Sequence, residues 1–165
     1  MSMDSRFERA LRIVLEYEGV TISDNPNDLG GVTNSGIAQS SHPGINVTKL
    51  SSQQIRMIYY QQYYKPFENL PGPMAFFCFQ FGVNVGPGLA AKILQECLGV
   101  TADGIIGPIT EKAAKEQFSP EFMAKLGDTV VRHYFDFVME DQSQREFLQG
   151  WMRRTVNASM RAWEF

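Results

Sequence analysis

The sequence predicts a mainly α-helical fold, with any β-structure confined to residues 20–47. Apolar residues recur at helical spacing along most of the chain, and no segment shows the strict alternation of a half-buried strand. The stretch 20–47 is instead rich in Asn, Asp, Gly, Pro and Ser, which is typical of a long loop or a small hairpin. The 165 residues, 44% hydrophobic and 20% charged, have the composition of a globular domain.

The first predicted helix spans residues 5–18. Phe7, Leu11 and Val14 are spaced four and three residues apart, so they share one helical face. One further step of four along this face reaches Glu18, and the glycine that follows it is a common helix terminator. The sequence therefore places a carboxyl group at the end of an apolar helical face.

After the loop, the rest of the chain is predicted as a series of helices whose ends carry recognisable caps or prolines. Ser51 to Gln54 and Ser143 to Glu146 have the pattern of capping boxes. Prolines open several of the other helices. The expected ranges are about 51–64, 73–85, 89–98, 108–117, 120–141 and 143–163.

Charge and composition exclude several classes of protein. The formal net charge of -3 argues against nucleic-acid binding, which favours a basic patch. Cys78 and Cys97 are too few for a disulfide framework or a zinc site, and their apolar surroundings predict buried free thiols. The histidines, His42 and His133, lack a ligand pattern, so we expect neither a metal nor another cofactor. No apolar run is long enough for stable membrane insertion, and no targeting signal is visible at the N-terminus.

Glu18 is the first candidate catalytic residue. Partial burial and the negative end of the helix dipole both disfavour the ionised carboxylate, and they raise its pKa toward the range of a general acid. Glycosidases use two carboxyl groups, and Asp24 and Asp28 follow in a Gly-rich loop that is able to face the first. The alternatives are a solvated carboxylate at a helix end for Glu18 and ordinary turn chemistry for the two aspartates.

The segment EGVTISDNPNDLGGVTNSGI resembles the N-terminal signature of the glycoside hydrolase family 108 lysozymes, also known as secretion-activator proteins. The resemblance implies a lysozyme-like helical fold with Glu18 as the catalytic acid. The spacing of Glu18 and Thr33 also resembles the Glu…Asp…Thr arrangement of helical phage-type lysozymes. This second resemblance implies that Asp28 and Thr33 are further catalytic residues. Within the same motif we assign substrate-binding roles to Asp24, Gly31 and Asn34.

The segment FQFGVNVGPGLAAKILQECLGVTADGIIGPIT is similar to the family's predicted peptidoglycan-binding module. Asn84 lies in this motif, either capping a helix end or reaching the substrate cleft. Tyr63 and Tyr64 stand where the family often has Tyr-Trp, so we assign them to substrate binding, with core packing as the alternative. We expect a catalytic part over residues 1–70 and a binding-type part over 71–165, packed as one compact unit because no linker separates them.

The function that these features predict is an N-acetylmuramidase that cleaves the β-1,4 bond between N-acetylmuramic acid and N-acetylglucosamine. The alternatives are a non-catalytic wall-binding or secretion-accessory protein and a lytic transglycosylase. The expected partners are the glycan strands of peptidoglycan, together with a holin or secretion apparatus. The protein is expected to be made in the cytoplasm and to act at the cell wall or in the periplasm after release.

Overall fold

The structure, a computed structural model, describes residues 5–18, 22–23 and 33–165 of the chain. Its contacts fall into two compact units, Met1–Gln62 and Tyr63–Phe165. Helices dominate, and the described β-structure is a single antiparallel sheet of three two-residue strands. The mainly helical, lysozyme-like fold class with a small hairpin region is therefore confirmed. The expected division near residue 70, with both parts packed as one unit, remains a prediction.

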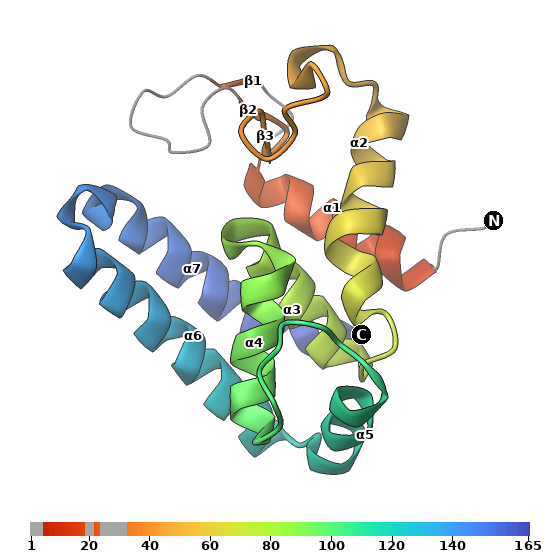
Figure 1. Cartoon of the computed structure of the whole chain (residues 1–165), viewed down its shortest axis with the longest axis vertical. Helices are drawn as coiled ribbons and strands as arrows, with labels where there is room; N and C mark the ends of the chain where they lie inside the picture. The colour runs from red at the N-terminus through yellow and green to blue at the C-terminus, as the bar shows by residue number, and fades with distance from the viewer. Residues whose placement is uncertain (1–4, 19–21, 24–32) are drawn as a thin grey trace. The chain divides into compact units, whose positions relative to one another are not determined.

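Helix α1 (Ser5–Glu18) opens the first unit and has the predicted bounds (Figure 1). Its Phe7, Leu11 and Val14 side chains are buried, as the spacing of the apolar residues indicated. The ring of Phe7 meets that of Tyr60 edge to face, with centroids 5.1 Å apart. The buried face of α1 is thus held against the end of the second helical segment of this unit.

That second segment begins as α2 (Ser52–Ile58) and carries the predicted capping box. The side chain of Ser51 accepts a hydrogen bond from the Gln54 N–H, and Gln54 Oε1 accepts one from the Ser51 N–H at 2.9 Å. The helix then continues as a π-helix, Tyr59–Tyr64, in place of the α-helical turns that the sequence pattern predicts. Such wider turns are rare and carry no clear sequence signal.

The small sheet consists of β1 (Ile22–Ser23), β2 (Thr33–Asn34) and β3 (Ile37–Ala38), in that order. Ser35 and Gly36 join β2 to β3 with φ angles of 50° and 78°. A two-residue hairpin with both central residues in the left-handed region matches the twist of the paired strands. The turn therefore requires Gly36 or another residue that tolerates positive φ.

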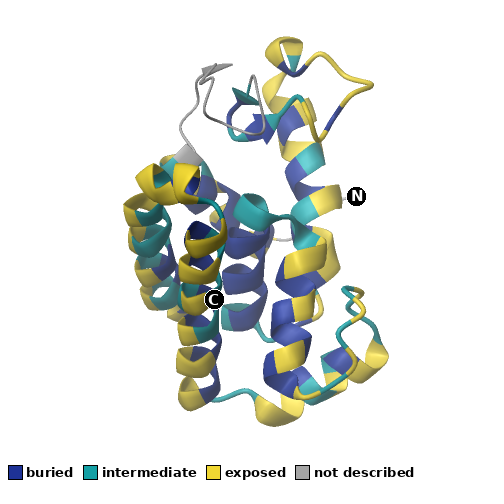
Figure 2. Ribbon diagram, turned by 60° about the vertical axis from the view of Figure 1, so that its left-hand side comes forward, coloured by how far each residue is buried: buried dark blue, intermediate teal, exposed yellow. Residues whose placement is uncertain are grey.

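Helix α3 (Gly72–Val85) forms the buried centre of the second unit. Every side chain from Met74 to Phe81 is buried, which is typical of a helix that is apolar all round. Figure 2 shows the buried inner faces of the surrounding helices and their exposed outer faces. The surrounding elements are η3 (Lys65–Phe67), α4 (Pro87–Leu98), α5 (Pro108–Gln117), α6 (Pro120–Glu140), η4 (Gln142–Gln144), α7 (Arg145–Arg161) and η5 (Ala162–Glu164).

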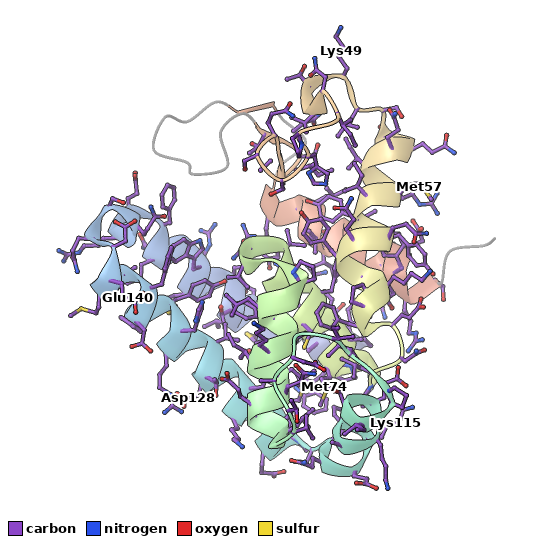
Figure 3. The ribbon with its side chains drawn as sticks, viewed as in Figure 1. Lys49, Met57, Met74, Lys115, Asp128 and Glu140 are labelled. Carbon is purple, nitrogen blue, oxygen red and sulfur yellow. The ribbon has the colours of Figure 1, made fainter. Side chains whose placement is uncertain are left out.

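The helices α6 and α7 run side by side, and their contacts fix which surfaces face outward (Figure 1). Asp128 and Glu140 lie on the exposed side of α6, whereas Met74 of α3 lies in the interior (Figure 3). No helix among the described residues is both long enough and apolar enough to traverse a lipid bilayer.

The prediction of a capping box at Ser143 and Glu146 is wrong. Helix α7 begins at Arg145 without a side-chain cap, because the preceding turn is capped by another residue. The carboxylate of Asp141 accepts hydrogen bonds from the Ser143 hydroxyl at 2.6 Å and from the Ser143 N–H at 3.0 Å. These bonds stabilise the ionised form and lower the pKa of Asp141 below its usual value.

Both cysteines are buried free thiols, as predicted. Burial raises the pKa of the Cys78 thiol far above its usual value, and the neighbouring Cys97 acts in the same direction. A thiol in this setting stays protonated and is a poor nucleophile. Cys78 therefore gives no support to thiol-based catalysis.

Candidate functional site

Glu18 is the last residue of α1, one helical turn beyond the buried Val14. The structure places its backbone at the helix C-terminus, where the sequence predicted it, and its side chain lies outside the described part of the chain. The helix end carries about half a negative elementary charge from its unpaired carbonyl groups.

Three of the candidate residues in the loop lie outside the described residues: Asp24, Asp28 and Gly31. Their assigned roles remain predictions. The strands on either side of this segment are described, and they pair with each other: Ser23 of β1 lies opposite Thr33 of β2. Thr33 is half-buried and also pairs with Ala38 of β3, so its backbone position is fixed by strands on both sides.

Asn34 is a buried side chain that ties the hairpin to the following segment. Its amide donates a hydrogen bond to the Val47 carbonyl oxygen at 2.8 Å, and its amide oxygen accepts one from the Ser35 hydroxyl at 3.1 Å. Buried amides need such partners to offset the loss of water. Asn34 therefore has a structural role in the described residues, and its assignment to substrate binding remains a prediction.

The β2–β3 turn is also anchored to the helical part of the first unit. The Tyr59 hydroxyl donates a hydrogen bond to the Ser35 carbonyl oxygen at 2.7 Å, and both residues are buried. The ring of His42 contacts the Ala38 carbonyl oxygen at 3.2 Å and Gln62 Oε1 at 2.8 Å. Sequence reasoning did not identify this anchoring, because its partners are 24 and 20 residues apart along the chain.

The two tyrosines assigned to substrate binding differ in their surroundings. Tyr64 is 2% exposed, and its ring packs edge to face with Phe79 of α3 at a centroid distance of 5.5 Å. Tyr63 is half-buried. Tyr64 thus contributes to the core of the second unit, which was the alternative given for it, and binding of substrate by either tyrosine remains a prediction.

Asn84 lies near the end of α3 and bonds across to two other helices. Its amide nitrogen donates to the Tyr134 hydroxyl of α6 at 2.9 Å, and its amide oxygen accepts a hydrogen bond from Arg154 of α7. Neither of these bonds is the helix cap that the sequence suggested. They fix the orientation of the Asn84 amide, and contact with substrate remains a prediction.

The described residues contain no cluster of His, Cys, Asp or Glu side chains that fits a metal ion. The ring nitrogens of His42 are both engaged by polar groups of the first unit. The candidate catalytic residues carry carboxyl and hydroxyl groups, which are the groups used in acid–base chemistry on polar substrates.

All of these candidate residues lie in one part of the chain that matches a known protein family. The profile of the family described as Glycosyl hydrolase 108 matches residues 11–86, and that of the Predicted Peptidoglycan domain matches residues 89–156. Among solved structures, the chain is similar to that of Brucella abortus SagA, with 28% sequence identity and a TM-score of 0.84, over 96% of this chain and 94% of that chain. A comparison with curated proteins found no match. Residues 11–86 thus form a glycosyl hydrolase 108 domain, and the predicted peptidoglycan domain follows it over residues 89–156.

Proposed function

We propose that this protein is a peptidoglycan hydrolase, an N-acetylmuramidase that cleaves the β-1,4 bond between N-acetylmuramic acid and N-acetylglucosamine. The observation that carries the proposal is the position of Glu18 at the end of the buried face of α1, inside the region matched by the glycosyl hydrolase family. In this mechanism the Glu18 carboxyl group protonates the glycosidic oxygen as the bond breaks.

Asp28 and Thr33 complete the proposed mechanism. Asp28 activates the attacking water or stabilises positive charge on the sugar ring, and Thr33 orients that water. The pairing of β2 with the strands on both sides holds the Thr33 backbone in place, which supports a positioning role. Asp24, Gly31, Asn34, Tyr63, Tyr64 and Asn84 are the proposed substrate-binding residues.

The proposed partner is the glycan strand of peptidoglycan, consistent with the predicted peptidoglycan domain over residues 89–156. The site of action is then the cell wall or the periplasm. We further propose that a holin or a secretion apparatus delivers the protein there, as expected for an endolysin or a secretion activator.

A non-catalytic wall-binding protein is the second candidate. The signature that this segment resembles usually begins Glu-Gly-Gly-Tyr, and here Val20 and Thr21 stand in place of its second Gly and its Tyr. Incubation with purified peptidoglycan separates the two. The hydrolase lowers the turbidity of the suspension and releases soluble fragments. A binding protein sediments with the intact wall and leaves the turbidity unchanged, which would contradict the proposal.

The roles of Asp28 and Thr33 predict that Asp28→Asn and Thr33→Ala each lower the rate of wall digestion and leave wall binding nearly intact. Asp28→Asn is expected to melt at the normal temperature, because its carboxylate acts in the reaction. Thr33→Ala is expected to show a milder loss of rate with some loss of stability. Melting temperature and specific activity are measured on the same preparations.

If Asp28 instead stabilises a turn, the outcome is reversed. The Asp28→Asn protein then melts at a lower temperature, with a free-energy loss of about 0.5–2 kcal/mol as for a lost cap, and keeps its normal rate per folded molecule. That result would move the second catalytic role to Asp24 or remove it.

A further inference from the structure

The β2–β3 hairpin carries Thr33 and is very small. Thr33 lies opposite Ala38, and each strand of the sheet has two residues. Hairpins of this size are at best marginally stable in water, because few hydrogen bonds offset the cost of ordering the chain. Strand pairing therefore sets the register of Thr33, and contacts from outside the sheet are needed to hold the hairpin itself.

The turn of this hairpin contains a strained residue. Ser35 has a φ angle of 50° and is the one non-glycine residue with positive φ in the part of the chain that the structure describes. A residue with a Cβ atom disfavours this conformation, which persists where surrounding contacts enforce it and is concentrated at functional sites. Ser35 is 1% exposed, so the turn is enclosed by such contacts.

The first contact that holds the hairpin comes from Tyr59, at the start of the π-helix. Its hydroxyl donates a hydrogen bond to the Ser35 carbonyl oxygen at 2.7 Å, in a buried environment. A buried carbonyl group that loses its donor is unfavourable, so this bond opposes movement of the turn away from the helix. We call it the Tyr59 tether.

The second contact comes from Gln62, three residues further along the same π-helix. Its Oε1 atom lies 2.8 Å from Nε2 of His42, and Nδ1 of His42 lies 3.2 Å from the Ala38 carbonyl oxygen. We call this chain of contacts the Gln62 tether, and it reaches the residue that pairs with Thr33. One π-helix thus holds the hairpin both at its turn and at the strand opposite Thr33. Turns of this kind occur frequently at functional sites.

We infer that the π-helix positions Thr33 for the reaction, with Tyr59 and Gln62 as positioning residues that act through the hairpin. The inference rests on the proposed function, in which Thr33 orients the attacking water. A catalytic group that is displaced by about 1 Å can lose about 10²-fold in rate, so a small movement of the hairpin matters. Because the oriented water enters the chemical step, the tethers are expected to affect kcat and not KM.

The test measures the initial rate at which the full chain releases reducing ends from soluble, uncross-linked peptidoglycan strands, over a range of strand concentrations. Tyr59→Phe removes one tether, and its kcat is expected to fall about threefold with KM unchanged, a smaller loss than for Thr33→Ala. Gln62→Leu removes the other tether and is expected to act in the same direction. Because the two variants break different bonds, the test remains decisive if one of them fails to fold.

A double-mutant cycle shows whether the tethers act through Thr33. In the Thr33→Ala background, Tyr59→Phe and Gln62→Leu are expected to have no further effect on kcat, because the side chain that they position is absent. A purely structural role would give the same fold-change in both backgrounds. Amide hydrogen exchange over residues 33–38 is expected to be faster in both variants, which reports the loosening of the hairpin without any substrate.

Ile55→Val is the control for stability alone. Ile55 is a buried residue of α2 in the same unit, and the change removes one methylene group from the core and no hydrogen bond. The control is expected to lower the melting temperature, as loss of a buried methylene does, and to keep kcat. A loss of kcat in the tether variants is then not explained by lower stability.

The inference is overturned if neither tether variant lowers kcat, if only KM changes, or if kcat falls equally in the Thr33→Ala background. When this happens in a protein whose natural sequence releases reducing ends, the positioning role fails and the proposed function stands. If the natural sequence releases no reducing ends, the proposed function fails and the positioning role fails with it.

Discussion

Replacing Glu18 with glutamine is expected to slow peptidoglycan digestion by a factor of roughly 10²–10⁴, the usual contribution of general acid catalysis. The amide has nearly the same size as the carboxyl group but cannot donate a proton to the glycosidic oxygen. Because Glu18 is the last residue of α1, the change leaves the buried face of the helix intact. The loss of turbidity of a peptidoglycan suspension measures the rate.

Glu16→Gln is the matched control for this prediction. Glu16 lies on the exposed side of the same helix, two residues earlier, and carries the same carboxyl group. The control is expected to keep both its melting temperature and its rate. If Glu18→Gln retained most of the activity, Glu18 would not be the acid and the proposed site would be wrong.

The second large effect is expected for Gln95→Met, on stability. Gln95 of α4 is 1% exposed and bonds to the turn that follows this helix. Its amide nitrogen donates to Asp103 Oδ1 at 2.8 Å and to the Ile105 carbonyl oxygen at 3.0 Å, and its amide oxygen accepts from the Gly104 N–H at 2.8 Å. Met leaves the Gly104 N–H and the Ile105 carbonyl oxygen without this partner, so we expect the free energy of unfolding to fall by about 1–3 kcal/mol.

Chemical denaturation measures this loss, with Gln149→Met as a surface control that leaves stability unchanged. The hydrogen bond from the Ile105 N–H, and to a smaller extent the one from Gln95, lower the pKa of Asp103 below its usual value. Because Gln95→Met removes the second bond, the pKa of Asp103 is also expected to rise in the variant. An unchanged unfolding free energy for Gln95→Met would contradict this role. In the same unit, Gln80→Met is instead expected to keep the free energy of unfolding, because the Gln80 amide has no hydrogen-bond partner among the described residues.

The helix boundaries were the most predictable part of the fold because their signals are local. Pro108 opens α5, and Ser119 caps α6 by accepting a hydrogen bond from the Phe122 N–H, as their positions in the sequence indicate. The turn at Asp103 is likewise an ordinary Asp-Gly turn, in which Asp103 Oδ1 accepts the Ile105 N–H at 2.8 Å. Where two caps compete nearby, as Asp141 and Ser143 do, sequence alone did not identify the residue that prevails.

The polar side chains inside the second unit were harder to predict because their partners are distant in sequence. Asn84 bonds to Tyr134 and Arg154, which are 50 and 70 residues away. Sequence reasoning identified Asn84 as a polar residue in an apolar setting but did not find these partners. Gln80 carries the same signal, a glutamine in an apolar run, and only its burial without partners distinguishes it from a bonded core residue.

Analysis of the glycan ends after digestion of purified peptidoglycan is the measurement that tests the proposed muramidase most directly. The account predicts new reducing ends of N-acetylmuramic acid, produced by the natural sequence and not by the Glu18→Gln variant. New 1,6-anhydro ends would instead identify a lytic transglycosylase that uses a single carboxyl group. Reducing ends of N-acetylglucosamine, or no new ends at all, would contradict the account.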